Sequence, residues 1–577
     1  MNAERLLQHY EQIADAPDAI SRLRRFILDL AVRGKLVPQD SGDEPASELL
    51  KRIEVEKARL VRLGEIRKSP TYEPIVETDT LYTLPTTWAW VRVGDIFDYD
   101  AGTKRDPKDL EQSRWLLELE DIEKDTSRIL ERLRVSDRDS QSTKSEFKPG
   151  DILYGKLRPY LNKVVVADEY GYSTTEIVAI RPFLRLYPEY CVLAFRRPDF
   201  VAYVERLGRG TKMPRLRTPD AIAALFPLPP LAEQQRIVTK VDELMAFCDA
   251  LEAARTERET KRDRLAAASL SRLNAPAPET FRDDARFALD ALPALTARPD
   301  QIKQLRQTVL NLAVRGKLVP QEPADESTEE LLRRISTEKK RLLAEKGIRG
   351  QKPALPAENF EMDTDIPETW RHVYFQDIAY QITDGTHLTP KYTETGKPFL
   401  SAQNVKPFRF MPEKHRFVSE QDFDSYRANR RPERGDILLT RVGAGIGEAA
   451  VLDSDFEFAF YVSLCLIKVP TCCINVEYLV LWLNSPEGRD SSSSRTYGKG
   501  ASQGNLNLGL IRTFKIPLPP LAEQHRIVIK VNELMALCDQ LETSLTSADD
   551  TRKKLLDALL TEALAPMHAE TLREAAE

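Results

Sequence analysis

The segment LAVRGKLVPQ occupies Leu30 to Gln39 and recurs without change at Leu312 to Gln321. A second segment, PLPPLAEQ, occupies Pro227 to Gln234 and recurs at Pro517 to Gln524. The stretches between these blocks, 187 and 195 residues long, agree only in scattered short strings. This period is far longer than the roughly 20 to 50 residues of a solenoid repeat. The pattern therefore predicts a duplicated domain pair, with a constant frame that holds two inserts free to differ.

Each PLPPLAEQ block is followed by apolar residues at helical spacing. From Ile237 to Leu251, and again from Ile527 to Leu545, apolar residues recur at intervals of four and three. This seam is typical of a long amphipathic helix or a coiled coil. Since proline does not fit inside a helix, we expect the two helices to begin just after Pro230 and Pro520.

A second helical unit surrounds each LAVRGKLVPQ block. The residues before Gly34 and Gly316 have helical spacing, and each glycine is a candidate stop at the helix C-terminus. A charged helix is expected next in each copy, over 46–63 and 327–346. The second of these helices opens with a capping-box pattern at Ser327.

The inserts have a different pattern, in which short β-type runs alternate with Gly, Pro and Asn turns. ILYGKL, KVVVAD and EIVAIRP are such runs in the first insert, and DILLTRV, AAVLD and VSLCLIKV in the second. Helix-like stretches are expected over 189–205 and 476–484. We interpret the inserts as compact mixed α+β domains of ~145 residues, a usual domain size.

Composition restricts the classes of protein that need to be considered. The six cysteines form no CxxC pair, which disfavours a metal or disulfide framework. No stretch approaches the ~18 apolar residues of a membrane span, so a soluble, intracellular protein is expected. The net charge is -6, but 147–217 holds 13 Lys and Arg against 7 Asp and Glu. A clustered basic face is therefore a better guide to nucleic-acid binding than the overall charge.

Several short motifs occur in the same order in the two halves. They are LPTTW at Leu84 and IPETW at Ile366, GDIL at Gly150 and Gly435, and the late loops GTKMPRL from Gly210 and GKGASQGNLN from Gly498. The second half also contains DGTHLTPKYTETGKPFLSAQNV from Asp384. Together with the repeated PLPPLAEQ exit, this ordered set resembles the specificity subunits of type I restriction-modification systems. The resemblance covers essentially the whole chain.

The resemblance implies a fold with two mixed α/β target recognition domains separated by long antiparallel helices. These helices would form a coiled coil, and the internal repeat would have pseudo-two-fold symmetry. The expected domains are an N-terminal helical region (1–70), a first recognition domain (84–228), a central helical region (231–350), a second recognition domain (366–518) and a C-terminal helical region (521–577).

The same resemblance implies a function in reading double-stranded DNA. Each recognition domain would read one half of a bipartite site, while the helices bind two modification subunits, which are adenine N6-methyltransferases. S-adenosylmethionine would bind to those subunits, and ATP and Mg²⁺ to additional restriction subunits. No cofactor or metal is expected on this chain, no membrane partner is expected, and the expected location is the cytoplasm of a prokaryote.

The residues themselves favour a non-catalytic chain. The sequence contains neither an Asn/Asp-Pro-Pro-aromatic methyltransferase motif nor a GxxxxGK[ST] phosphate loop. An enzyme acting alone is therefore disfavoured. The main alternative is a helical scaffold protein whose two inserts bind peptide or RNA.

Candidate DNA-binding residues in the first domain are basic or aromatic. Arginine can bridge guanine O6 and N7, and lysine suits phosphates, although a solvated charged surface would have the same composition. The candidates are Lys104, Arg105, Lys156, Arg158, Tyr160, Lys163, Arg209, Lys212, Arg215 and Arg217.

Candidates in the second domain are richer in amides and hydroxyls. Gln and Asn can pair with adenine edges, but they also form turns, which is an equal possibility for Asn505 and Asn507. GAGIG at 443–447 is interpreted as a tight turn. The candidates are Thr386, His387, Lys391, Gln403, Asn404, Arg441, Lys499, Ser502, Gln503 and Asn505.

The predicted helices are also expected to set the distance between the two half-sites. A helix from 231 to 270 would span ~60 Å at ~1.5 Å per residue. Inserting four residues, about one turn, within the charged stretch 256–261 should lengthen the non-specific spacer by about one base pair and leave both half-sites unchanged. Mapping adenine methylation in cells that carry the variant checks this expectation. An unchanged spacer in an active complex would show that the helices do not set the distance.

Overall fold

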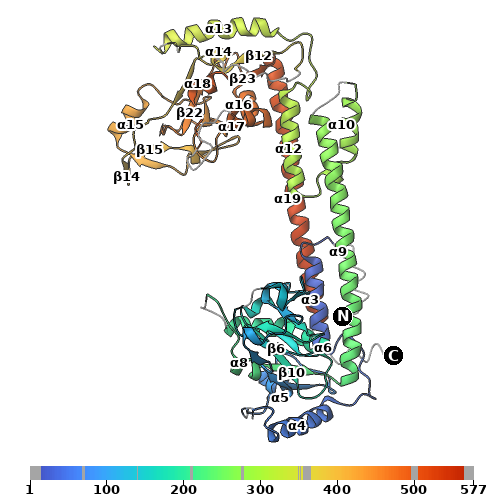
Figure 1. Cartoon of the computed structure of the whole chain (residues 1–577). Helices are drawn as coiled ribbons and strands as arrows, with labels where there is room; N and C mark the ends of the chain where they lie inside the picture. The colour runs from blue at the N-terminus through green and yellow to red at the C-terminus, as the bar shows by residue number, and fades with distance from the viewer. Residues whose placement is uncertain are drawn as a thin grey trace. The chain divides into compact units, whose positions relative to one another are not determined.

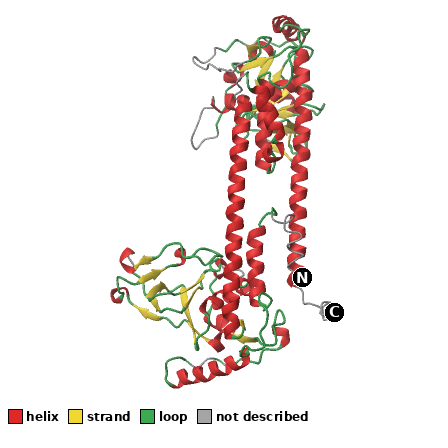
Figure 2. Ribbon diagram, turned by 90° about the vertical axis from the view of Figure 1, so that its right-hand side faces the viewer, coloured by secondary structure: helices red, strands yellow, loops and turns green. Residues whose placement is uncertain are grey.

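The computed structural model describes residues 15–67, 70, 72–138, 141–207, 212–274, 279–348, 350, 352–354, 366–494 and 504–564. The chain divides into two compact units. The first unit comprises residues 1–258 and 549–577, and the second comprises residues 259–548. Each unit combines a mixed domain of strands and short helices with long helices (Figures 1 and 2). The expected mixture of helices and sheets is confirmed.

Two helices of equal length follow the PLPPLAEQ blocks. α9 spans Leu231–Asn274 and α19 spans Leu521–Leu564, each 44 residues. Both begin directly after the paired prolines, as predicted. Residues 231–258 of α9 lie in the first unit and 259–274 in the second, while α19 divides between the units at 548 and 549.

In each unit a shorter helix packs against parts of both long helices. In the first unit, α3 (Ala19–Val32) buries Ile27 in a core with Ile237 of α9. It also buries Phe26 against Leu556 of α19. In the second unit, α12 (Pro299–Val314) contributes to one core with the start of α19 and packs against another with the end of α9.

The mixed domain of the first unit contains an antiparallel sheet in the order β2-β10-β7-β8 and a five-stranded sheet in the order β3-β6-β9-β4-β5. The first strand of the domain, β1, pairs with its last strand, β11, which directly precedes α9. This pair brings the start and the end of the domain together. The elements are β1 (Ala89–Arg92), α5 (Val93–Ile96), β2 (Phe97–Tyr99), β3 (Thr103–Arg105), β4 (Trp115–Leu117), β5 (Leu133–Arg134), β6 (Lys144–Phe147), β7 (Ile152–Gly155), β8 (Val164–Val166), β9 (Gly171–Thr174), β10 (Ile177–Pro182), α6 (Pro188–Arg196), α7 (Pro198–Leu207), α8 (Thr218–Ala223) and β11 (Leu225–Leu228).

The second mixed domain repeats the first sheet in the order β13-β22-β19-β20 and the closing pair as β12–β23. A further sheet has the order β14-β18-β15-β21, and β16–β17 form a hairpin. The elements are β12 (Arg371–Tyr374), α14 (Phe375–Ile378), β13 (Gln381–Asp384), β14 (Tyr392–Thr393), β15 (Lys397–Leu400), β16 (Val405–Lys406), β17 (Arg409–Phe410), β18 (Arg416–Val418), α15 (Glu420–Arg427), β19 (Ile437–Thr440), β20 (Ala449–Val451), β21 (Ala459–Phe460), β22 (Leu464–Lys468), α16 (Val476–Asn484), α17 (Pro486–Ser494), α18 (Leu508–Arg512) and β23 (Lys515–Leu518).

The repeated sequence blocks of the first unit meet at one buried carboxylate. Glu233, from PLPPLAEQ, accepts a hydrogen bond from Trp88 Nε1 at 2.9 Å and one from Gln39 Nε2 at 2.6 Å. Trp88 ends LPTTW, and Gln39 ends LAVRGKLVPQ. Burial raises the pKa of Glu233, and these two hydrogen bonds offset part of that effect. One side chain thus joins three segments that are far apart in the sequence.

The second unit contains the same arrangement at equivalent residues. Glu523 accepts from Trp370 Nε1 at 3.0 Å and from Gln321 Nε2 at 2.8 Å. Burial is again the largest influence on the pKa of the carboxyl group, which is raised. The duplication is therefore one of side-chain contacts as well as of sequence.

Two sets of ion pairs are duplicated in the same way. Arg236 pairs with Asp43 at 2.6 Å, and the equivalent pair, Arg526 and Asp325, has the same distance. Arg24 of α3 contacts Asp249 and Glu252 of α9. The equivalent contacts in the second unit are those of Arg306 with Asp539 and Glu542.

The charged helices lie where the sequence predicts them, as α4 (Ala46–Arg62) and α13 (Thr328–Glu345). The Ser327 side chain caps α13 by accepting from the Glu330 amide.

One prediction was wrong: the expected helix over 189–205 is two helices, α6 and α7. The break falls at Pro198, which has no amide hydrogen for the helical ladder. The stretch 274–299, whose Pro and Ala content suggests a linker between two helical units, also contains α10 (Phe281–Asp290) and α11 (Leu292–Leu295).

Gly34 lies where a side chain would collide with the frame. It adopts φ +66°, and a Cβ would lie 2.4 Å from Pro85 Cγ. Gly64, after α4, has a similar φ of +72° but no heavy atom within 4 Å of the Cβ position. The two glycines therefore share a conformational requirement and differ in steric space.

We expect Gly34→Ala to destabilise the first unit by more than Gly64→Ala does. The left-handed conformation alone costs an alanine ~1 kcal/mol, and the collision adds ~1–3 kcal/mol. The urea midpoints of the two full-length variants, compared with that of the unmodified chain, measure the difference. Equal midpoints for the two variants would contradict the steric contribution.

Candidate nucleic-acid interface

Backbone hydrogen bonds join two predicted loops of the first unit. After β7, the Leu216 amide donates to the Lys156 carbonyl at 2.9 Å, and the Arg158 amide donates to the Pro214 carbonyl at 2.8 Å. Residues 156–162 and 212–217 thus form one surface, which we call the first loop pair. It brings together six predicted residues: Lys156, Arg158, Tyr160, Lys212, Arg215 and Arg217.

Most cations of the first loop pair have no carboxylate partner. Within the described residues, no hydrogen bond or ion pair engages the side chains of Lys156, Arg158, Lys212 and Arg217. Arg215 differs, because its Nε and Nη2 donate to the two carboxylate oxygens of Glu176, each at 3.0 Å. The unpaired cations give this loop pair an excess of positive charge, the electrostatic requirement for binding a phosphate backbone.

The backbone of the first loop pair is strained at two non-glycine residues. Arg158 has φ +50° and Asn162 has φ +53°, on either side of the short 3₁₀ turn Pro159–Leu161. A left-handed conformation costs energy for a residue with a Cβ, and strained residues of this kind cluster at functional sites. The turn presents Arg158 and Tyr160 as exposed side chains.

The remaining first-domain candidates lie elsewhere. Arg105 on β3 pairs with Glu146 at 2.7 Å, and burial would raise the pKa of Glu146 but hydrogen bonds from Arg105 and Arg114 lower it overall. Lys104 contacts Asp100 at 3.4 Å. Lys163 donates to the Leu119 carbonyl at 2.7 Å, and burial lowers its pKa. Its ammonium thus faces the protein. Arg209 lies outside the described residues.

The second unit forms an equivalent loop pair, comprising 441–447 and 504–507. Val442 pairs with Asn505 as Leu157 pairs with Arg215, each through an isolated antiparallel bridge. The Leu506 amide donates to the Arg441 carbonyl at 2.8 Å. Arg441 therefore occupies the position that Lys156 has in the first unit.

Two side chains of the second loop pair, Arg441 and Asn505, form a hydrogen-bonded network with Asp384 and His387. Arg441 is buried and donates to Asp384 Oδ2 at 2.6 Å and to Asn505 Oδ1 at 3.1 Å. His387 Nε2 lies 3.0 Å from the same Asp384 oxygen, and its side chain is 67% exposed. Arg441 is thus neutralised within the protein, while His387 presents its ring to solvent. This surface offers hydrogen-bonding groups more than net charge.

Other second-domain candidates divide into exposed and buried residues. Lys391 and Gln403 are exposed, and Thr386 is buried with its hydroxyl accepting from the Leu388 amide. Asn404 is fully buried and donates to the carbonyls of Met411 and Lys414, so both of its amide hydrogens are used inside the protein. Lys499, Ser502 and Gln503 lie outside the described residues.

Sequence reasoning missed two residues that shape these surfaces. Asp384 fixes Arg441 and His387, and Glu176 holds Arg215. Asn507 has the turn role that the sequence allowed, since its side chain accepts from the Gly509 amide at the start of α18.

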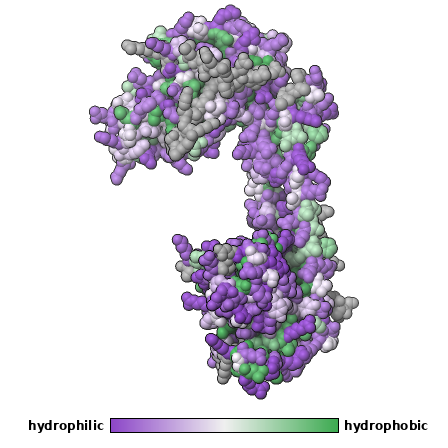
Figure 3. Space-filling model, viewed as in Figure 1, coloured by the Kyte–Doolittle hydropathy of each residue, from purple (hydrophilic) through white to green (hydrophobic). Residues whose placement is uncertain are grey.

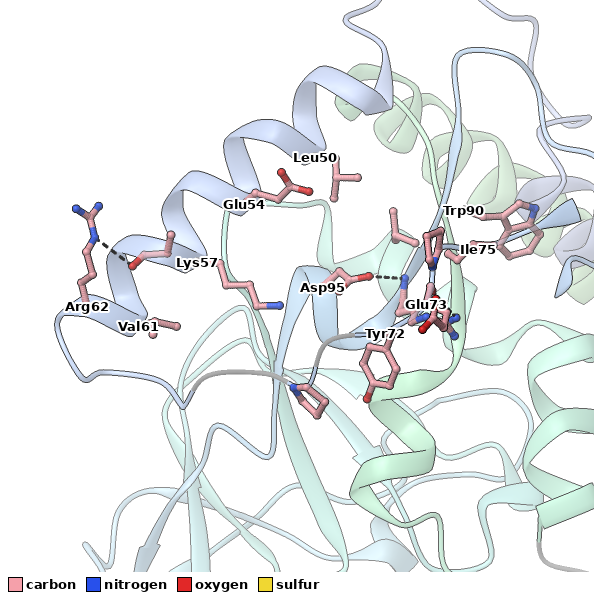
Figure 4. A pocket seen from close by; sticks show the side chains of 15 residues that line it. Leu50, Glu54, Lys57, Val61, Arg62, Tyr72, Glu73, Ile75, Trp90 and Asp95 are labelled. Atoms are coloured by element: carbon pink, nitrogen blue, oxygen red, sulfur yellow. Dashed lines mark hydrogen bonds between the residues drawn. The ribbon is translucent and has the colours of Figure 1, made fainter.

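A cavity in the first unit lies apart from both loop pairs. It has a volume of about 780 Å³ and lies between α4 and a segment that contains Pro70 and residues 72–75 (Figure 4). Lys57 enters it and donates to the Gly94 carbonyl at 2.7 Å, and burial lowers the pKa of Lys57. No predicted DNA-binding residue that the structure describes lines this cavity.

The mixed domains present mainly hydrophilic residues on the face shown in Figure 3. Among the residues with described positions, no cluster of three or more His, Cys, Asp or Glu could hold a metal ion. No described helix is long and apolar enough to cross a membrane.

Comparisons with known proteins agree with the motif pattern. The family model for the type I restriction modification DNA specificity domain matches residues 367–548. The chain is 30% identical to the type I restriction enzyme EcoAI specificity subunit of Escherichia coli, over 94% of this chain and 93% of that protein. It is also 30% identical to the EcoEI specificity subunit of the same organism, over 94% of each.

Among solved structures, the HsdS subunit from Thermoanaerobacter tengcongensis is similar, with a TM-score of 0.42 and 20% identity over 84% of this chain and 98% of that one. The curated relatives match almost their full length at 30% identity. The chain therefore belongs to the specificity subunits of type I restriction-modification systems, the non-catalytic subunits that give these complexes their DNA sequence specificity.

Proposed function

We propose that the two mixed domains each read one half of a bipartite DNA site. The observation that carries this proposal is the equivalence of the two loop pairs. Each follows the corresponding strand of its own domain's sheet, β7 or β19, and the two present different side chains there. Equivalent scaffolds with different recognition residues suit two half-sites of different sequence. The unpaired cations of the first loop pair favour phosphate contacts. The His387–Asp384–Arg441–Asn505 network favours hydrogen bonds to base edges.

We further propose that the two units are related by pseudo-two-fold symmetry, with the long helices antiparallel as a coiled coil. The duplicated contacts of Glu233 and Glu523 support equivalent units. Two equivalent helical surfaces would bind two modification subunits, one for each half-site. The five domains defined from the sequence, with recognition domains at 84–228 and 366–518, belong to the same proposal.

The chemistry is assigned to the partners. S-adenosylmethionine would bind to the modification subunits, and ATP and Mg²⁺ to restriction subunits. The chain's sequence lacks the methyltransferase and phosphate-loop motifs that such chemistry requires. The proposed location is the cytoplasm of a prokaryotic cell, where the complex meets DNA.

Methyl transfer should require the partner. We expect the purified chain to transfer no methyl group from S-adenosylmethionine to DNA, and activity to appear when the modification subunit is added, because that subunit would extrude and methylate the adenine. Radiolabelled methyl incorporation measures this. Transfer by the rigorously purified single chain would refute the assignment. Binding of RNA or peptide in preference to duplex DNA would favour the scaffold alternative.

The first loop pair should supply phosphate contacts. Lys156→Ala and Lys212→Ala should each weaken binding of the assembled complex to all DNA sequences and reduce the slope of log K against log[salt] by about one. Lys148→Ala is the matched control, because this exposed lysine precedes β7 and so lies at the opposite end of that strand from the loop pair. Affinity titrations at several salt concentrations give the slopes. Unchanged slopes for both loop variants would remove the first loop pair from the interface.

A further inference from the structure

The hairpin β16–β17 of the second unit presents an aromatic residue at its tip. Val405 pairs with Phe410 and Lys406 with Arg409, so Pro407 and Phe408 form the turn. The buried Asn404 fastens the base of the hairpin, because its side chain donates to the Met411 and Lys414 carbonyls at 2.9 and 2.7 Å. The tip therefore stands on a rigid base.

Phe408 is both strained and exposed. Its φ is +64°, a region that bulky side chains rarely adopt. The residue is 44% exposed, and its amide donates to the Ala449 carbonyl at 3.0 Å, which holds the backbone in place. Because much of the ring is in solvent, its burial contributes little stabilisation to offset this strain. Such an outlier indicates a functional constraint.

Cations flank the aromatic ring in the sequence. Lys406 and Arg409 are exposed, and Lys406 Nζ lies 3.5 Å from Glu448 Oε2. The Arg409 side chain has no hydrogen-bond or ion-pair partner among the described residues. An exposed ring beside an unpaired guanidinium matches a nucleic acid, which presents flat apolar bases next to phosphates.

The hairpin lies beside the second loop pair. The Thr440 amide donates to the Glu448 carbonyl, and the Gly447 amide donates to the Thr440 carbonyl, both at 2.8 Å. Glu448, the residue paired with Lys406, therefore directly follows the 443–447 turn of that loop pair. Lys406, Glu448 and the loop pair belong to one edge of the domain.

The first unit has an equivalent hairpin without an aromatic residue. Ile122 pairs with Ile129, and Asp121 takes the place of Asn404: it accepts from the Glu118 amide at 2.7 Å, as Asn404 accepts from the Ser401 amide at 3.0 Å. The left-handed residues at its tip are Asp125 and Ser127. The Asp125 amide donates to the Leu161 carbonyl, within the first loop pair, at 3.3 Å. In this unit too, the hairpin tip adjoins the loop pair.

We propose that Phe408 stacks on a base or sugar of the half-site that the second domain reads, while Arg409 contacts a neighbouring phosphate. This inference rests on the proposed function of the two domains. Apolar side chains inserted at base steps of duplex DNA are an established means of recognition. The first domain, which has Asp125 and Ser127 at the equivalent tip, makes no such contact, so the two half-sites are read by different means.

The experiment uses the full chain assembled with its modification subunit. The DNA is a duplex that contains the sequence motif that this complex methylates. Phe408→Gly should weaken specific binding about ten-fold, the equivalent of ~1.4 kcal/mol of lost stacking. It should leave the salt slope unchanged, because no charge is lost, and should not lower the thermal midpoint, because glycine tolerates φ +64°. Phe408→Tyr keeps the ring and should bind normally. Arg409→Ala should reduce the salt slope by about one.

Ser127→Gly is the matched control, since it places glycine at a left-handed residue of the first hairpin and should leave binding unchanged. As a direct probe of stacking, 2-aminopurine at one position of the second domain's half-site should change its fluorescence on binding the unmodified complex but not the Phe408→Gly complex. Normal binding by Phe408→Gly, or a loss matched by a lower thermal midpoint, would overturn the inference. If the unmodified complex showed no sequence-specific binding, the proposed function itself would fail instead.

Discussion

A buried carboxylate at the start of each long helix is the contact on which the rest of the structure depends. Glu233 and Glu523 each accept one hydrogen bond from a tryptophan and one from a glutamine. A buried carboxylate without partners would be very unfavourable. The start of the helix, the start of the mixed domain and the LAVRGKLVPQ block must therefore be in contact in the folded protein. This requirement fixes where each mixed domain begins and ends relative to its helices.

This frame explains how the inserts can differ while their placement is constant. Glu233 and Trp88 lie at the exit and the entry of the first mixed domain, and β1 pairs with β11 beside them. The loop pairs follow the C-terminal ends of the sheet strands β7 and β19. The contacts that join helix and domain are therefore the same in both units, while the exposed side chains of the loop pairs differ.

The two loop pairs show how much the same scaffold can vary. Lys156 and Arg441 occupy equivalent positions, yet the Lys156 side chain has no hydrogen-bond or ion-pair partner among the described residues, whereas the Arg441 side chain is buried and paired with Asp384. Arg215 and Asn505 are likewise equivalent, and one pairs with Glu176 while the other accepts from Arg441. The equivalent surfaces thus differ in charge and in hydrogen-bonding groups.

The sequence alone determined the duplication, the starts of α9 and α19 after their prolines, the capped start of α13 and most strands of the central sheets. These features depend on local rules, namely proline geometry, capping and alternating apolar residues. It also selected the loops that adjoin one another, because basic and amide residues cluster there. Only the tertiary structure decided which of these side chains face solvent. Lys163 and Asn404 look like their neighbours in the sequence, but their polar atoms bond to carbonyl groups inside the protein. Such pairing depends on partners distant in the chain, which no local pattern specifies.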